Sequence, residues 1–120
     1  MNNFKQTIIL DFDGVIHAYK GWNGPTHFEN EMVEGCAEAL EKYLEYFEVA
    51  IYSTRSHNPE AKQALEDWCK QRLPEKTFKK LKFVSTKVPS HVMLDDRGIT
   101  FNGTWPSLET IKNFKPWWKN

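Results

Sequence analysis

The chain has 120 residues, a length typical of one domain and sufficient for a hydrophobic core that needs no disulfide or structural metal. Its 16 basic residues balance its 16 acidic ones, which argues against a protein that coats nucleic acid non-specifically but leaves a local basic groove open. The two cysteines form no CxxC pair, so they fit neither a disulfide framework nor a zinc site. The sequence shows no secretory signal pattern and no apolar run near the ~20 residues of a membrane span, so we expect a cytoplasmic protein without membrane contact.

Strands and helices are expected to alternate along the chain. Thr7–Leu10 is a short, apolar, β-branched run typical of a strand buried on both faces. Residues 33–47 place apolar side chains at helical spacing, and residues 48–53 form a second apolar run. Asn58, followed by a proline, predicts the start of a helix that ends near Leu73.

The second half of the chain continues this alternation. Residues 82–86 and 91–96 are expected to be the third and fourth strands, and residues 107–114 a final short helix. Residues 99–105 are expected to form a hairpin around an Asn-Gly turn. The order indicates an α/β fold: one Rossmann-like three-layer domain over residues 1–120 with a mostly parallel sheet.

The segment between the first strand and the first helix is irregular. Residues 14–30 contain three glycines, a proline and several aromatic residues, and are expected to form a small flap or hairpin. Trp22 in this segment either closes over a ring of the substrate or only seals the flap onto the body. His17 and His27 are expected to be exposed there. No insertion in the chain is long enough for a cap domain.

Polar residues follow the strands at one edge of the predicted sheet. Ligands of such sheets bind beyond the carboxyl ends of the strands. Asp11 and Asp13 end the first strand, and Asp95 with Asp96 ends the fourth. The remaining candidates, after the second and third strands, are Ser53, Thr54, Arg55 and Lys87.

The acidic residues at this edge predict a metal site. Asp11 and Asp13 share a face if the strand persists, because side chains alternate along a strand. Two carboxylates ~4 Å apart repel each other by about 4 kcal/mol at an effective dielectric constant near 20, so the cluster requires a cation or a bound proton. Ligands that are all oxygen indicate a hard cation, and Mg²⁺ is the ordinary one.

Hydroxyl and cationic groups complement these carboxylates. Ser53, Arg55 and Lys87 offer a hydroxyl, a guanidinium and an ammonium group, which are the groups that bind phosphoryl oxygens. Taken singly, Ser53 also fits a turn at a strand end, and the two cations also fit a solvated surface.

These residues resemble the motifs of the haloacid dehalogenase-like (HAD) superfamily of phosphatases. The run from Asp11 to Val15 resembles the first motif, Ser53 the second, Lys87 the third, and the pair of Asp95 and Asp96 the fourth, in the family's chain order. The stretches "STR" and "LDDRGITFNG" are similar to small capless members, including the phosphatase domains of polynucleotide kinases.

The resemblance implies a hydrolase of phosphomonoesters. Asp11 would be the nucleophile that forms an aspartyl-phosphate, and Asp13 the general acid and then the general base. Mg²⁺ would be held by Asp11, the backbone carbonyl of Asp13 and Asp95, with Asp96 supporting or sharing that role. Ser53 and Lys87 would bind the phosphoryl oxygens, and Arg55 would add a further clamp.

Several alternatives remain open from the sequence. Lys82 is a rival to Lys87 because Lys87 lies close to the fourth motif, and Thr54 is a rival to Ser53. The Trp117-Trp118 pair covers the sheet edge, which we favour, or contacts a partner chain. No obligate protein partner is indicated.

The substrate and the class of function also stay open. An uncapped site admits a small phosphorylated molecule, a nucleotide, a nucleic-acid end or another bulky phosphate. One alternative function is a receiver-like phosphoacceptor module, although there the acidic pair comes first and here it comes last. The other is a non-catalytic HAD-fold binding protein, which would be expected to lack at least one of the acids.

Overall fold

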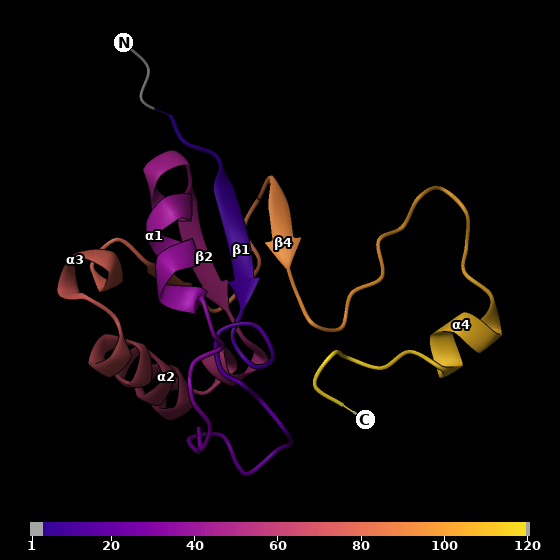
Figure 1. The fold of residues 1–120 in the computed structure, drawn as a ribbon, viewed down its shortest axis with the longest axis horizontal. Helices are drawn as coiled ribbons and strands as arrows, with labels where there is room; N and C mark the ends of the chain where they lie inside the picture. The colour runs from indigo at the N-terminus through magenta and orange to yellow at the C-terminus, as the bar shows by residue number, and fades with distance from the viewer. Residues whose placement is uncertain (1–3, 120) are drawn as a thin grey trace.

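The computed structural model describes residues 4–119, whose centre is a four-stranded sheet. The strands are β1 (Thr7–Asp11), β2 (Glu48–Tyr52), β3 (Lys82–Val84) and β4 (Val92–Leu94). They are all parallel and lie in the order β3-β2-β1-β4 (Figure 1). This confirms the α/β class with a parallel sheet, in which all carboxyl ends meet at one edge.

The helices begin and end at residues with clear local causes. They are α1 (Cys36–Tyr46), α2 (Pro59–Arg72), α3 (Glu75–Phe78) and α4 (Leu108–Lys112), with a 3₁₀ turn η1 (Thr54–His57). α2 starts as predicted, because the Asn58 side chain accepts hydrogen bonds from two N–H groups of its first turn. α1 starts later than predicted, because Gly35 before it has a φ of 84°, outside the helical region. Within residues 4–119, no helix has the length and apolar character needed to cross a membrane.

The main core lies between the sheet and the helices α1 and α2. Side chains that alternate along β1 and β2 point to this face, where the two helices supply their buried residues. The central members of this cluster are Ile8, Leu10, Val49, Ile51, Leu40, Leu44, Leu65 and Trp68. Figure 1 shows α1 lying across the strands on this side. Ile9 and Ala50, the intervening strand residues, point to the other face and are also buried.

The other face is crossed by the connection from β3 to β4. These strands lie on opposite edges of the sheet, so residues 85–91 must pass over one face, and the helices already fill the first. The connection is a coil, with the His91 N–H bonded to the Thr7 carbonyl at its end. The expected third layer is therefore a coil segment and not a helix. This path brings Lys87 past the carboxyl ends of the strands.

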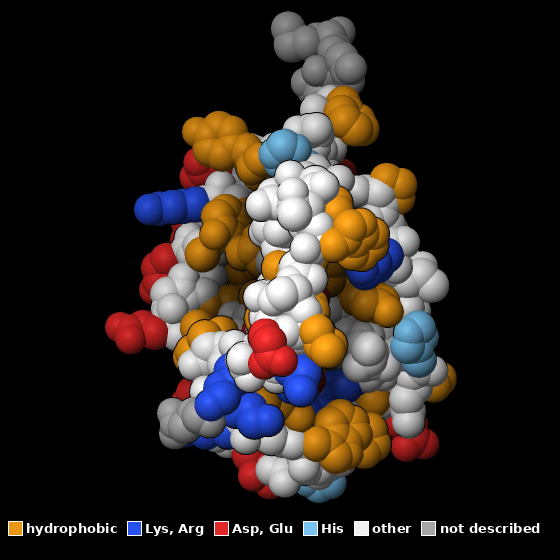
Figure 2. Space-filling view, turned by 90° about the vertical axis from the view of Figure 1, so that its right-hand side faces the viewer, with side chains coloured by type: hydrophobic (Ala, Val, Ile, Leu, Met, Phe, Trp, Pro, Cys, Tyr) orange, Lys and Arg blue, Asp and Glu red, His pale blue; other side chains and the backbone are white. Residues whose placement is uncertain are grey.

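The prediction of a hairpin over residues 99–105 is wrong. These residues contain no strand, and a turn at Asn102 is held by its side chain, which accepts the N–H of Thr104. Figure 1 shows this segment extending away from the sheet before it returns through α4. Large apolar side chains of this segment and of α4 are exposed: Ile99, Phe101, Trp105, Leu108 and Ile111. Figure 2 shows hydrophobic side chains at several separate places on this side of the molecule.

Candidate functional site

The carboxyl ends of the strands surround a cavity of about 300 Å³. Its lining residues are Asp11, Asp13, Tyr19, Trp22, Tyr52, Ser53, Thr54, Lys87, Met93, Asp95, Asp96 and Arg97. The cavity thus brings together all the residues predicted for the site except Arg55. They come from the ends of β1, β2 and β4, from the 14–30 loop and from the β3–β4 connection.

Three carboxylates form the acidic part of this cavity. Asp11, Asp95 and Asp96 each offer an oxygen atom, and these atoms lie within 4.8 Å of one another. Burial raises the pKa of Asp11 to about 8, with further contributions from a hydrogen bond with Asp96 and from the negative charges of Asp95 and Asp96. The close grouping of three oxygen donors with such mutual repulsion fits a hard divalent cation such as Mg²⁺.

Gly14 allows Asp96 to reach this cluster. Gly14 has a φ of 84°, and a Cβ atom there would lie 2.1 Å from Asp96 Oδ2. Any side chain at this position would therefore displace the Asp96 carboxylate. The same Oδ2 accepts a hydrogen bond of 2.6 Å from the indole N–H of Trp118.

Asp13 is held by two buried side chains. Arg55 Nε lies 2.6 Å from Asp13 Oδ2, and His17 Nδ1 lies 2.9 Å from Asp13 Oδ1. The N–H of Asn30 donates to His17 Nε2, so the proton of the neutral ring is on Nδ1, which donates to Asp13. Burial opposes ionisation of Asp13, but these hydrogen bonds and the charge of Arg55 outweigh it, so the pKa of Asp13 is lowered.

Arg55 lies behind Asp13 and does not line the cavity. It is only 3% exposed, and its Nη1 donates to the carbonyl oxygens of Gly24 (2.6 Å) and Pro25 (2.9 Å). Its guanidinium carbon lies 4.5 Å from the ring centre of Trp22 and 4.8 Å from that of Phe28. Arg55 therefore fastens the 14–30 loop to the end of β2, a placement that differs from the predicted phosphate clamp.

His17 is also buried, contrary to the expectation that the loop histidines are exposed. Its ring stacks on Phe12 and contacts the edges of Phe28 and Trp68. His27 is exposed, as expected. Sequence reasoning missed His17 because a single histidine in a loop carries no signal of the long-range aromatic packing that buries it.

The structure separates the two candidate lysines and leaves both candidate hydroxyl groups at the cavity. Lys87 lines the cavity, whereas Lys82 begins β3 and pairs with Glu48, which begins β2. Lys82 therefore lies at the amino ends of the strands, away from the site. Ser53 is buried and its Oγ accepts the N–H of Arg55 at 3.1 Å, while Thr54 is exposed at the cavity rim. Both remain in contact with the cavity.

The C-terminal tryptophans contribute to the site, which the sequence did not indicate. Trp118 bonds to Asp96, and its ring meets the edge of Tyr19 at 4.9 Å between centres. Trp117 donates its indole N–H to the carbonyl of Gly14 at 2.7 Å and is otherwise exposed. Neither residue belongs to the core, but Trp117 borders a cavity that Met93 and Leu94 of the edge strand β4 also line, so the pair lies beside that sheet edge. Its role as a cover for the edge stays a prediction.

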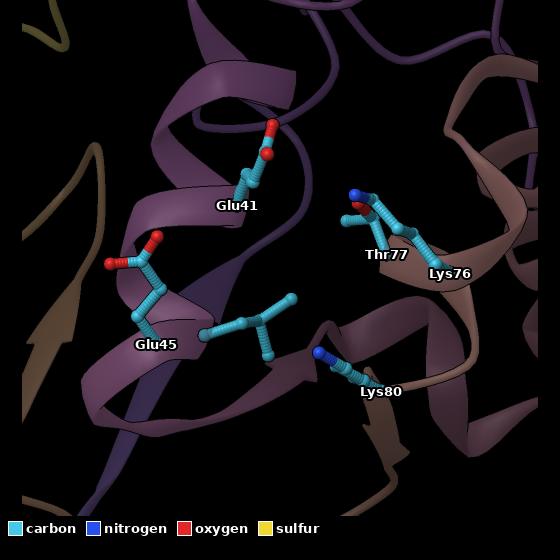
Figure 3. A pocket seen from close by; sticks show the side chains of 6 residues that line it. Glu41, Glu45, Lys76, Thr77 and Lys80 are labelled. Carbon is cyan, nitrogen blue, oxygen red and sulfur yellow. The ribbon is translucent and has the colours of Figure 1, made fainter.

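A second cavity lies between α1 and α3. Figure 3 shows Glu41 and Glu45 of α1 on one side of this cavity and Lys76, Thr77 and Lys80 on the other. Two acidic and two basic side chains balance each other there, and no strand end reaches this cavity. It therefore offers neither the clustered carboxylates nor the convergent polar groups of the cavity at the strand ends.

Comparisons with family models, with curated proteins and with solved structures give no match for this chain. The class of protein is therefore inferred from the site's own residues. The site lies at the carboxyl ends of a parallel sheet. It contains three clustered carboxylates, a fourth carboxylate held by Arg55, and a lysine and a serine that line the same cavity.

Proposed function

We propose that this protein is a Mg²⁺-dependent phosphatase that hydrolyses phosphomonoesters through an aspartyl-phosphate intermediate, as in HAD-like enzymes. The observation that supports the proposal most is that Asp11, in a cluster of three carboxylates, shares one cavity with Ser53 and Lys87. Carboxylates alone would bind a cation. The added ammonium and hydroxyl groups suit the oxygens of a phosphoryl group.

Asp11 is the nucleophile in this mechanism. A carboxylate oxygen of Asp11 attacks phosphorus, the bond between phosphorus and the leaving oxygen breaks, and the phosphoryl group is transferred to Asp11. Water then attacks the same phosphorus, and the bond to Asp11 breaks to release inorganic phosphate and the free carboxylate. Asp11, Asp95 and Asp96 would hold Mg²⁺, whose positive charge would keep Asp11 ionised.

Asp13 moves the protons. It gives a proton to the leaving oxygen in the first step and takes one from the attacking water in the second. Its hydrogen bonds to His17 and Arg55 hold it as a carboxylate, which favours the second step. For the first step, we infer that the negative phosphoryl group offsets the charge of Arg55 and so raises the pKa of Asp13 when substrate binds.

Lys87 and Ser53 bind the phosphoryl oxygens, and Lys87 also offsets the charge of Asp11. Thr54 lies at the rim, where it contacts a substrate that extends outward. Trp22 exposes 60% of its surface beside the cavity and can pack against a ring of the substrate. The open site suits a nucleotide, a nucleic-acid end or another bulky phosphate as well as a small molecule.

Because Cys36 and Cys69 are free thiols, we place the protein in the reducing cytoplasm.

The direct test is hydrolysis of a generic aryl phosphate with and without Mg²⁺. The native protein should require Mg²⁺, and Asp11→Asn should lose activity by at least 10³-fold because no nucleophile remains. Glu41→Gln, in the cavity between α1 and α3, is the matched control and should retain the native rate. Equal rates for the native protein and Asp11→Asn would contradict the proposal, and a phosphoenzyme that lasts many minutes would support the receiver-like alternative.

A further inference from the structure

The last residues of the chain return to the candidate site and bond to two of its loops. The indole N–H of Trp118 donates to Asp96 Oδ2, and the indole N–H of Trp117 donates to the carbonyl of Gly14. Pro116, just before them, is buried. One short segment is therefore attached both to the loop after β1 and to the loop after β4, which carry the carboxylates of the candidate metal site.

Trp118 is held in position by contacts on its ring as well as by its N–H. The edge of Tyr19 lies against the Trp118 ring, and the guanidinium carbon of Arg97 lies 5.5 Å from the ring centre. The hydrogen bond of 2.6 Å joins a neutral donor to a carboxylate, a charge-assisted type that is stronger than a bond between neutral groups. Trp105, in contrast, is 84% exposed and has one ring contact, with Phe101.

These contacts restrict the rotation of the Asp96 carboxylate. Asp96 Oδ2 occupies the space that a side chain at Gly14 would fill, and it also receives the Trp118 N–H. Rotation of the carboxylate would break that bond and move Oδ2 out of the space above Gly14. The bond from Trp118 therefore fixes the orientation of the carboxylate that contributes one oxygen to the group with Asp11 and Asp95.

We propose that Trp118 is a positioning residue for the metal site: its N–H holds the Asp96 carboxylate in the orientation that binds Mg²⁺. This inference rests on the proposed function, because it assumes that Asp96 contributes to the metal site. Groups that hydrogen-bond to metal ligands orient them, and loss of such a group typically weakens metal binding about 10–100-fold. Trp117 supports the same arrangement by fixing the backbone of Gly14 beneath Asp96.

The test is a titration of the protein with Mn²⁺, followed by electron paramagnetic resonance, with Mn²⁺ as the probe for the Mg²⁺ site. Trp118→Phe keeps an aromatic ring against Tyr19 but removes the N–H, so it should bind Mn²⁺ at least about 10-fold more weakly. Trp105→Phe makes the same chemical change at an exposed residue that does not line the cavity, and should bind Mn²⁺ as the native protein does. Equal Mn²⁺ affinity in all three proteins overturns the proposal.

A second measurement needs no variant at the site. In ¹⁵N-labelled native protein, the indole N–H resonance of Trp118 should shift on addition of Mg²⁺, because its acceptor carboxylate binds the cation, whereas that of Trp105 should not. A Trp118 resonance that stays unchanged at saturating Mg²⁺ also overturns the proposal. The Trp105→Phe variant assigns the control resonance.

The two proposals fail in different ways. If the native protein shows Mg²⁺-dependent hydrolysis while Trp118→Phe binds Mn²⁺ normally, the role of Trp118 is wrong and the phosphatase proposal stands. If the native protein neither binds Mn²⁺ nor hydrolyses an aryl phosphate, the metal site itself is wrong and both proposals fall.

Discussion

Buried Arg55 and partly buried Asp13 form an ion pair in which Nε and Oδ2 lie 2.6 Å apart. The same guanidinium binds the carbonyl oxygens of Gly24 and Pro25, so one side chain joins the proposed acid/base residue to the 14–30 loop. Arg55 thereby links the electrostatics of the site to the position of the loop that borders it.

Arg55→Met should destabilise the protein by about 3 kcal/mol or more, because the substitution leaves the Asp13 carboxylate without its cation. It should also release the 14–30 loop to proteolysis. Lys82→Met is the control, since Lys82 and Glu48 form an exposed pair whose loss should cost about 0–1 kcal/mol. Urea denaturation measures both free energies. Similar losses for the two variants would show that the pair of Arg55 and Asp13 stabilises the fold no more than an exposed pair does.

Asp11→Asn should raise the melting temperature of the metal-free protein at pH 8.5 more than at pH 5.5. The folded protein raises the pKa of Asp11 from 3.8 to about 8, so it retains a proton that the unfolded chain releases. The stability from this protonated form is complete below about pH 4 and is lost as the pH rises through about 8. An amide at position 11 carries no charge and escapes that loss.

Mg²⁺ should restore the stability of the native protein at pH 8.5 but have little effect on Asp11→Asn. Thermal denaturation in EDTA and in Mg²⁺ at the two pH values measures this. Asp67→Asn, on the exposed side of α2, serves as the charge-matched control and should show no such pattern. A pH-independent difference between the native protein and Asp11→Asn would contradict the proposed environment of Asp11.

Gly14→Ala should lose Mn²⁺ affinity as well as stability. Both Gly14 and Gly103 have positive φ values, so an alanine at either position costs about 1 kcal/mol in backbone strain. Only at Gly14 would the new Cβ meet Asp96, whereas nothing lies within 4 Å at Gly103. Gly103→Ala therefore isolates the backbone cost. If the two variants bind Mn²⁺ equally well, the close approach of Asp96 to Gly14 is not needed for the metal site.

Lys87→Met should lower kcat/KM for an aryl phosphate by about 10²–10³-fold, because it removes a cation from the developing charge on the phosphoryl group. Lys82→Met should leave kcat/KM unchanged, since Lys82 lies at the opposite ends of the strands. Steady-state kinetics of the two variants decides between the lysines. Loss of activity in Lys82→Met alone would show that Lys82, and not Lys87, binds the phosphoryl group.

The strands and the main helices could be predicted because their signals are local. The β-branched apolar run predicts β1, and the Asn58-Pro59 pair predicts the start of α2, from neighbouring residues alone. Both predictions are confirmed. The convergence of Asp11, Asp95 and Lys87 on one cavity also followed from the sequence. Parallel strands bring their carboxyl ends to one edge, so residues that follow those strands must meet there.

The failures concern residues whose surroundings come from distant parts of the chain. The Asn-Gly turn at 102 lacks flanking strands, because a hairpin needs cross-strand partners and a packed face that residues 99–105 do not have. His17 is buried by Phe12, Phe28 and Trp68, which no local pattern around position 17 reveals.

By itself, the sequence determined the α/β order of elements and the sheet edge at which the acidic residues gather. The alternation of strands and helices and the ends of the strands depend on neighbouring residues. Only the tertiary structure decided that Arg55 turns behind Asp13 and that Trp118 reaches Asp96. Those contacts join residues 42 and 22 positions apart, respectively. Their formation depends on how the 14–30 loop and the C-terminal segment pack against the finished sheet, and that packing is a property of the whole chain.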